Sequence, residues 1–323
     1  MNQPIQISDL DPFIDFEVEI QKLKKDLNAI ILGHYYQIDD IQDIADFVGD
    51  SLELSRKAMQ TDASVIVFCG VKFMAEVAHI VNPNCTVLLP DLSAGCSLEN
   101  LCQPEDFKKF RSAHPDHIAL TYINCSAEVK ALSDIIVTSS NAEKIISHIP
   151  KNQKILFAPD KHLGRYLSKK TSRDMLLWNG TCIVHENFSE RELIRLKTTH
   201  SNARIIAHPE CPMHLLDYAE HIGSTSSLIK YATKHNGDEF IVLTEPGIIR
   251  QMQIHSPASK FYAVNSINQS GCVSCSDCPY MKKNTIEKLY LCMVNQFPKI
   301  TLDYNIAQKA KLSIDRMMEY SSM

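Results

Sequence analysis

The stretch AIILGHYY, residues 29–36, decides the fold, because two later stretches of the chain repeat its form. They are IALTYIN, residues 118–124, and ARIIAHPE, residues 203–210, and the three recur about every 86 to 88 residues. Each is a short apolar run that ends in polar residues. Such a run is typical of a strand that is buried on both faces of a parallel sheet. The sequence therefore predicts three repeats that each begin with a strand of this kind.

Two further apolar runs follow in each repeat, and helical patterns separate them. The second runs are predicted at 64–69, 133–137 and 222–226, and the third runs at 86–91, 154–160 and 239–246. Strands that alternate with helices indicate βαβ units on parallel sheets. We therefore expect an α/β fold of three similar three-layer αβα domains with short parallel sheets. The expected domains are 1–112, 113–198 and 199–323, the last with a packing helix at 302–318.

Length, composition and charge limit the classes of protein to which the chain can belong. At 323 residues it exceeds one typical hydrophobic core. Its net charge of −5 argues against a nucleic-acid partner, which usually requires a basic surface. Residues 1–16 do not have the form of a secretory signal, and no run approaches the roughly 18 apolar residues of a membrane span. We therefore expect a cytoplasmic protein that does not bind a membrane.

Polar residues follow the first strand of each repeat, at the strand end where parallel α/β sheets bind ligands. If the three sheet edges face one another, they form one shared site; the alternative is that the repeats stack only for stability. Helix starts after strands are further candidate sites, since free N–H groups and the helix dipole favour phosphate or carboxylate. These starts are predicted at Ser51, Ser139, Ser224 and Thr225, where a plain helix cap is the alternative.

Cysteines supply the most distinctive local motif. Eleven cysteines in a reducing compartment indicate metal ligands rather than a disulfide framework. Cys272, Cys275 and Cys278 have the Cys-x2-Cys-x2-Cys spacing that iron-sulfur ligands use. A redox pair of Cys272 with Cys275 is an alternative. A structural zinc site would need a fourth nearby ligand, which residues 280–288 do not supply.

Two more cysteines, Cys96 and Cys182, lie in loops of the other repeats. One cysteine from each repeat could hold a 4Fe-4S cluster at the centre, with three irons bound and the fourth open to substrate. An open iron is a Lewis acid that polarises carboxylate and hydroxyl oxygens. This arrangement predicts lyase-like or condensing chemistry. The alternative is a non-enzymatic redox or carrier protein built on the Cys-x2-Cys-x2-Cys motif.

Many segments, taken together and in this order, resemble the bacterial quinolinate synthase family, the quinolinate synthetase A type with a C-terminal Cys-x2-Cys-x2-Cys motif. The resemblance covers nearly the whole chain. The matching segments are HYYQ at 34–37, GDS at 49–51, GVKFMAE at 70–76, AGCSL at 94–98, YIN at 122–124, SAEVKA at 126–131, TSSN at 138–141, PDKHLG at 159–164, CIVH at 182–185, HPECP at 208–212, GSTS at 223–226 and CPYMK at 278–282. One departure is Cys125, where the family more often has Ser or Thr.

The resemblance implies three αβα domains around a pseudo-threefold axis with a central 4Fe-4S cluster. It implies Cys96, Cys182 and Cys278 as the ligands, and Cys272 and Cys275 as extra thiols that a reversible disulfide could join. The implied enzyme is a transferase of NAD biosynthesis that condenses iminosuccinate with dihydroxyacetone phosphate to quinolinate, phosphate and water. L-aspartate oxidase, which makes iminosuccinate, is an implied functional partner. Another hydro-lyase with an open-iron cluster is the alternative enzyme.

The resemblance also implies roles at the positions that match. Glu210 is expected to be the general acid/base, with Tyr36 as the second choice and His34 as a further catalytic residue. The expected substrate-binding residues are His34, Ser51, Tyr122, Asn124, Ser139, His185, His208, Glu210, Ser224 and Thr225.

Overall fold

The computed structural model describes residues 5–267, 273–274 and 276–323, and its framework is three four-stranded parallel sheets with one common strand order. In spatial order the first sheet is β2 (Phe47–Gly49), β1 (Ala29–His34), β3 (Val65–Cys69) and β4 (Thr86–Leu88). The second is β6 (Ile135–Val137), β5 (His117–Tyr122), β7 (Lys154–Ala158) and β8 (Met175–Leu177). The third is β10 (His221–Ile222), β9 (Arg204–Ala207), β11 (Glu239–Leu243) and β12 (Lys260–Ala263). The predicted α/β architecture of three similar domains is confirmed.

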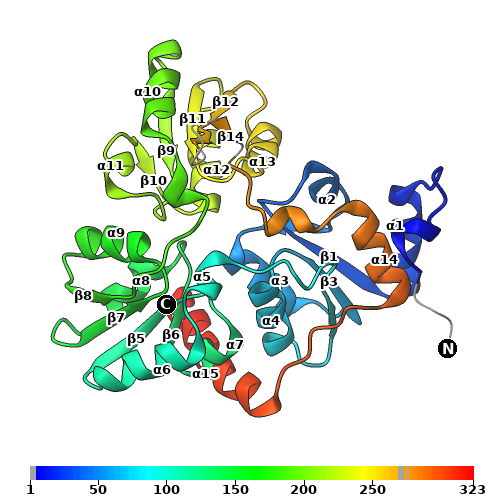
Figure 1. The fold of residues 1–323 in the computed structure, drawn as a ribbon, viewed down its shortest axis with the longest axis horizontal. Coiled ribbons are helices and arrows are strands. Elements are labelled where there is room, and N and C mark those ends of the chain that lie inside the picture. The colour runs from blue at the N-terminus through cyan, green and yellow to red at the C-terminus, as the bar shows by residue number, and fades with distance from the viewer. Residues whose placement is uncertain (1–4, 268–272, 275) are drawn as a thin grey trace.

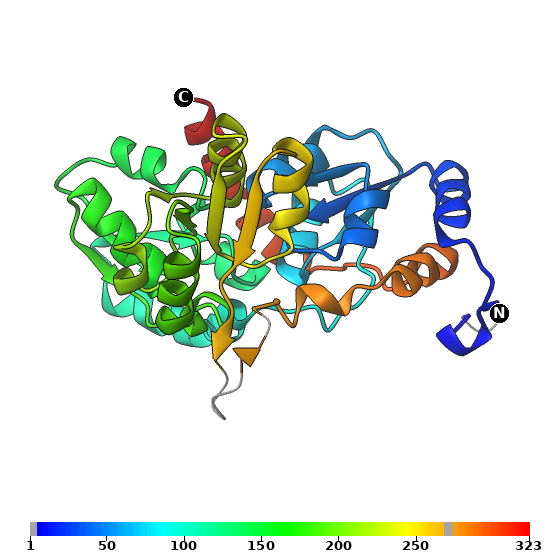
Figure 2. The ribbon, with the colours of Figure 1, turned by 90° about the horizontal axis from the view of Figure 1, so that it is seen from above.

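With their helices, the three sheets form three lobes around a common centre, here called the first, second and third lobe in sheet order (Figure 1). A two-stranded antiparallel pair, β13 (Ser266–Ile267) and β14 (Val273–Ser274), projects from this arrangement (Figure 2). The common strand order places the first strand of each repeat inside its sheet, between the second and third strands. The three repeats are therefore alike in topology as well as in sequence pattern.

In the first repeat, the second and third apolar runs were assigned to the wrong strands. The run at 64–69 forms β3 and the run at 86–91 begins with β4, which are the third and fourth strands of the first sheet. In the other two repeats, the runs assigned the same ranks overlap the second and third strands. The true second strand of the first sheet, β2, has only three residues and lies at the sheet edge. Only Phe47 and Val48 in it are large and apolar, and Asp46 and Asp50 flank it, so it leaves no apolar run that the sequence pattern could reveal.

Ile31 and Leu32 show why the first strands are apolar at successive positions. They are neighbours in β1 and both are fully buried, but they belong to different hydrophobic clusters. Successive side chains of a strand point to opposite faces, so a sheet covered on both faces requires apolar residues at each position. The covering helices on the cluster of Ile31 are α1 (Phe16–Asp26), α2 (Asp39–Ile44) and α14 (Ile286–Asn295). The first-lobe helices on the cluster of Leu32 are α3 (Ser51–Gln60) and α4 (Lys72–Val81), and this cluster continues into the second lobe.

The second and third sheets are covered in the same way. On the second sheet, α6 (Pro104–Ala113) and α7 (Ala127–Ala131) share one cluster, while α8 (Ala142–His148), α9 (Lys161–Thr171) and α15 (Tyr304–Ser322) belong to the cluster of Leu32. On the third, α10 (Glu190–Thr199) and α11 (Met213–Leu216) cover one face, and α12 (Thr225–Lys234) and α13 (Ile248–His255) cover the other. The short helix α5 (Ser97–Asn100) joins the first lobe to the second.

The two C-terminal helices pack away from the third lobe. Helix α14 lies against α1 and β3 of the first lobe, and α15 lies against β6, α7 and α8 of the second (Figure 1). The expected domain boundaries, 112/113 and 198/199, fall at the ends of α6 and α10 and stay predictions. The last two helices therefore tie the C-terminal part of the chain to both earlier lobes.

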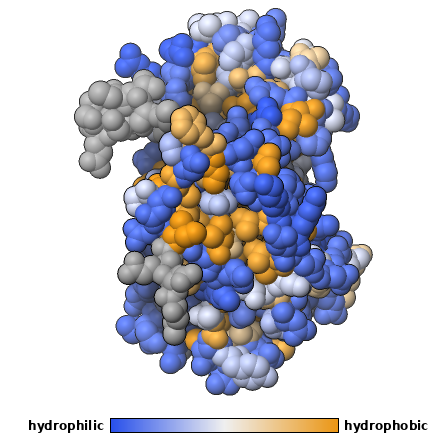
Figure 3. All heavy atoms as spheres, turned by 90° about the vertical axis from the view of Figure 1, so that its right-hand side faces the viewer, coloured by the Kyte–Doolittle hydropathy of each residue, from blue (hydrophilic) through white to orange (hydrophobic). Residues whose placement is uncertain are grey.

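On the face seen from the side of α1 and α14, hydrophobic side chains gather in the middle, among hydrophilic ones (Figure 3). Within the described residues, no helix combines the length and the apolar character that crossing a membrane requires.

Candidate active site

A pocket lies where the three lobes meet. Each sheet contributes to it the polar residues at the carboxyl end of its first strand. These residues are His34 and Tyr36 from β1 and its loop, Tyr122 and Asn124 from β5 and its loop, and His208 and Glu210 from the loop after β9. Parallel strands present ligand-binding residues at these ends. The structure thus brings the strand ends of all three repeats to one pocket.

Nearly all of the predicted site residues line this pocket. They are His34, Tyr36, Ser51, Cys96, Tyr122, Asn124, Ser139, Cys182, His185, His208, Glu210, Thr225 and Cys278. Ser224 is not among the lining residues, although it is buried beside them. Its Oγ accepts a hydrogen bond from the Ser227 N–H at 3.3 Å and caps α12. Its observed role is therefore that of a helix cap, whereas Thr225, the first residue of α12, faces the pocket.

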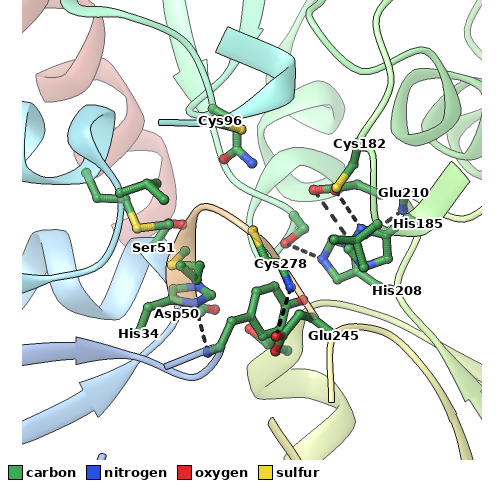
Figure 4. A pocket seen from close by; sticks show the side chains of 18 of the residues that line it. His34, Asp50, Ser51, Cys96, Cys182, His185, His208, Glu210, Glu245 and Cys278 are labelled. Carbon is green, nitrogen blue, oxygen red and sulfur yellow. Dashed lines mark hydrogen bonds and ion pairs between the residues drawn. The ribbon is translucent and has the colours of Figure 1, made fainter. Parts of the chain in front are cut away.

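The carboxylate of Glu210 is the centre of the polar contacts in the pocket (Figure 4). The Tyr122 hydroxyl donates to its Oε1 at 2.6 Å, and His208 Nδ1 lies 3.9 Å from the same oxygen. His185 Nδ1 lies 3.0 Å from Oε2, which is ion-pair distance, although the approach does not meet hydrogen-bond geometry. Burial alone would raise the pKa of Glu210, but the two histidines and the Tyr122 hydroxyl outweigh burial and lower that pKa. Glu210 is therefore ionised at neutral pH.

Thr244, which follows β11, connects a second tyrosine to this carboxylate. Its Oγ1 lies 2.7 Å from the Tyr36 hydroxyl and 3.0 Å from His185 Nε2. A hydroxyl can donate one hydrogen bond and accept another at the same time. Tyr36, Thr244, His185 and Glu210 therefore form a continuous polar path across the pocket, and its members come from the first and third lobes and from the segment between the second and third.

His34 and His208 are neutral bases in this site. Burial lowers the pKa of each to about 3, and the nearby Glu210 opposes this shift without reversing it. His34 Nδ1 accepts the Tyr36 N–H at 3.1 Å, so its Nε2 carries the proton and can donate. His208 Nε2 lies 3.3 Å from Ser139 Oγ. The two rings can thus form hydrogen bonds to an anionic ligand without adding net charge.

Asp50 joins the three lobes beside the pocket. It caps α3 by accepting the N–H groups of Leu52 and Glu53, at 3.0 and 2.9 Å. Its other oxygen accepts the hydroxyls of Ser140, from the second lobe, and Ser226, from the third lobe at 2.8 Å. Ser51, the residue after it, begins α3 and lines the pocket. The helix starts at Ser51 and Thr225 are therefore held in one place by contacts between lobes.

Comparison with known proteins identifies the family. The description of the matching family is "Quinolinate synthetase A protein", and the match spans residues 18–319. The chain belongs to this family. It is 61% identical over 303 residues to the quinolinate synthase of Ehrlichia chaffeensis, which covers 94% of this chain and 96% of that protein. It is 56% identical over 307 residues to the quinolinate synthase of Microcystis aeruginosa, with 95% of each chain covered. For the quinolinate synthase of Chloroherpeton thalassium, the identity is 54% over 319 residues, which covers 99% of this chain and 97% of that protein.

Three widely separated segments of the chain each present a cysteine to the pocket. Cys96, Cys182 and Cys278 lie on different sides of the pocket (Figure 4). They are free thiols that interact electrostatically with one another. Burial raises the pKa of all three, that of Cys278 to about 11. Buried thiolates therefore require a cationic partner, and this donor set fits a metal centre such as an iron-sulfur cluster.

A smaller set of ligand atoms also converges within this site. Atoms of Cys182, His185 and Glu210 all lie within 4.8 Å of one another, a grouping that could hold a metal ion. Cys272 and Cys275, the predicted redox pair, lie outside the described residues. Cys125 is fully buried in the cluster beneath α6, and burial raises its pKa to about 11.

Several pocket residues were not predicted from the sequence. Asp50 and Glu245 line the pocket, and Thr244 bonds to two residues that do. Thr244 and Glu245 lie directly after β11, at the end of the apolar run predicted at 239–246. Position after a strand was therefore an available signal for both. The contacts of Asp50 involve residues about 90 and 176 positions away, which no local pattern indicates.

Proposed function

We propose that the chain is a quinolinate synthase that condenses iminosuccinate with dihydroxyacetone phosphate, releasing quinolinate, phosphate and water. The observation that carries this proposal is the convergence of three cysteines and the Glu210 network on one buried pocket. The family match and the similarity to two quinolinate synthases support the same activity. A simple redox carrier would need the cysteines but not the histidines and tyrosines around them.

Cys96, Cys182 and Cys278 would hold a 4Fe-4S cluster, one cysteine from each repeat. When bound, such a cluster supplies a Lewis acid that polarises carboxylate and hydroxyl oxygens. The remaining chemistry is acid–base chemistry by side chains of this chain. Glu210, ionised and linked to Tyr122 and His185, is placed to take a proton from a substrate carbon or hydroxyl and to return it.

Both substrates are anions, and neutral donors would orient them. His34 and His208 have imidazole nitrogens that can donate into the pocket, and Asn124 adds a side-chain amide. Ser51, Ser139 and Thr225 line the pocket at or near helix starts, where N–H groups favour carboxylate and phosphate oxygens. Ser224 contributes indirectly by capping α12. Iminosuccinate would come from an aspartate-oxidising enzyme of the L-aspartate oxidase type.

The direct test is anaerobic purification followed by iron and sulfide analysis and a quinolinate assay with both substrates. The proposal expects about four irons and four sulfides per chain, in line with a 4Fe-4S cluster, and quinolinate that forms only when both substrates are present. An intact cluster without quinolinate formation would contradict the assigned activity. Quinolinate formation by protein that contains no iron would contradict the assigned cofactor.

A further inference from the structure

A buried ion pair lies beside the pocket and has no role in the function proposed above. Glu245 follows β11 in the third lobe, and its side chain is fully buried. Lys282, in the short 3-10 helix Met281–Lys283, places its Nζ 2.9 Å from Glu245 Oε1, and its side chain is 22% exposed. A buried charge is expensive unless hydrogen bonds satisfy it fully. The hydrogen bonds that satisfy the two charges therefore show which parts of the structure the pair holds.

Both oxygens of Glu245 accept backbone hydrogen bonds. The Cys278 N–H donates to Oε1 at 3.2 Å, and the Gly247 N–H donates to Oε2 at 2.7 Å. Lys282 in turn donates its backbone N–H to the carbonyl of Cys278 at 3.1 Å. The turn that carries Cys278 is thus held at its N–H by one member of the pair and at its carbonyl by the other.

The same lysine holds the first lobe. Lys282 Nζ donates to the backbone carbonyl of Tyr36 at 2.9 Å. The Tyr36 hydroxyl is the end of the polar path that leads through Thr244 towards Glu210. One ion pair therefore contacts the backbone of Cys278, a proposed cluster ligand, and the backbone of Tyr36, a proposed catalytic residue. These two residues are 242 positions apart in sequence (278 − 36).

Space around the pair is closed by backbone. A Cβ added to Gly247 would lie 2.8 Å from Glu245 Oε2 and 3.0 Å from both Lys282 Nζ and the Gln37 carbonyl oxygen. Gln42 Nε2 fixes this backbone by donating to the carbonyls of Gly247 at 2.8 Å and Gln37 at 2.9 Å. The pair consequently has little freedom to take other positions.

Although Glu245 lines the pocket, acid–base chemistry is a poor role for it. Lys282 and two N–H groups already occupy its oxygens, whereas a general base needs a lone pair directed at the substrate. We propose that Glu245 and Lys282 are positioning residues that fix the Cys278 sulfur and the Tyr36 hydroxyl relative to each other. The proposal rests on the proposed function, because that function makes Cys278 a ligand and Tyr36 catalytic.

The test uses Lys282→Met, which keeps the length of the side chain and removes its charge. In anaerobically prepared protein we expect the electron paramagnetic resonance spectrum of the reduced cluster to shift. We also expect kcat to fall by about 10- to 100-fold, the range seen when residues supporting a metal ligand are replaced. KM should change much less, because the charged groups of the pair bond to each other and to backbone groups. Lys282→Arg should recover part of kcat, since a guanidinium can reach both the carboxylate and the Tyr36 carbonyl.

Lys24→Met is the matched control. Lys24 Nζ lies 2.6 Å from Asp46, whose other oxygen accepts the Ile31 N–H at 2.8 Å, so the control removes a similar ion pair that holds a backbone amide. It lies on α1, outside the pocket lining. It should leave the spectrum and kcat at wild-type values. An equal effect of Lys24→Met and Lys282→Met would mean that the Glu245–Lys282 pair is merely structural.

A second variant keeps the test decisive if Lys282→Met does not fold. The double variant Glu245→Gln/Lys282→Met leaves no unpaired buried charge, so it should fold better than the single variant and still show the altered spectrum and lowered kcat. A wild-type spectrum and kcat in this double variant would overturn the positioning role. The proposed function itself would fail differently, because the wild-type protein would then lack iron or fail to form quinolinate.

Discussion

The Tyr122 hydroxyl of the second lobe donates a 2.6 Å hydrogen bond to the Glu210 carboxylate of the third lobe, and both side chains are buried. The two residues are 88 positions apart in sequence. Each lies at or just after the end of the first strand of its own repeat. The bond therefore shows that the strand ends of different repeats are in direct contact within one site. It also makes the protonation of Glu210 dependent on a residue from another lobe.

Replacing Glu210 by Gln should abolish most of the activity. The amide keeps the size of the side chain but cannot take a proton, and general acid–base groups typically contribute about 10²- to 10⁴-fold to rate. We expect kcat for quinolinate formation to fall within that range, while the iron content stays at the wild-type value. Tyr122→Phe should cost less, because it removes one donor and leaves the carboxylate. A Glu210→Gln protein with kcat within twofold of wild type would remove Glu210 from the acid–base role.

Thr244→Val tests the polar path from Tyr36 to Glu210. Valine has nearly the shape of threonine but no hydroxyl, so the contacts to Tyr36 and His185 are both lost. At about 0.5–1.5 kcal/mol for each hydrogen bond, we expect kcat to fall about tenfold with little change in KM. Thr233→Val is the control, since that hydroxyl only bonds the Ile229 carbonyl within α12. Equal activities of the two variants would show that the path carries no part of the reaction.

Acid should destabilise the metal-free protein through its buried histidines. The pKa of His34 and of His208 is about 3 in the folded state and about 6.5 in the unfolded chain. Between these values the unfolded state binds more protons, so stability falls as pH falls, by up to about 1.4 kcal/mol per pH unit for each histidine. Urea unfolding of chelator-treated protein at several pH values between 7 and 5 measures this slope. His208→Gln should reduce it, whereas His255→Gln, at an exposed position on α13, should not; a slope that is the same in both variants would contradict the assignment.

Cys182→Ser separates the proposed ligands from the other buried cysteines. A serine hydroxyl is a far weaker ligand for iron than a thiolate, so we expect the iron and sulfide content of anaerobically prepared protein to fall several-fold. Cys292→Ser provides the control, since Cys292 is buried in α14 among apolar residues of the first lobe. A full cluster in Cys182→Ser would exclude Cys182 as a required ligand.

The sequence predicted those parts of the fold that local patterns encode. The first strands β1, β5 and β9 are short apolar runs that recur along the chain, and the polar residues after them could be identified directly as site candidates. The edge strands β2 and β8 have three residues each, and the two-residue β10 overlaps its predicted run at a single position. Such short edges carry little apolar signal, and the register of the first repeat was misread for this reason.

Site residues whose role depends on distant partners could not be predicted. Ser224 and Thr225 are adjacent at one helix start, but only the structure shows that Ser224 caps the helix and Thr225 faces the pocket. Lys282 was part of a recognised segment, yet its contact with the Tyr36 carbonyl depends on how two lobes meet. Packing between lobes determines such roles, and the sequence pattern within one repeat does not predict that packing.

The position of α15 bears on how the protein is made. This helix, residues 304–322, completes one face of the second lobe by packing on β6, α7 and α8. Domains generally fold in order of synthesis as the chain emerges. The middle lobe must therefore wait, with part of its hydrophobic core uncovered, until the third lobe has been synthesised. The first lobe waits likewise for α14, so both earlier lobes keep apolar surface uncovered during synthesis, a condition that favours aggregation of a nascent chain.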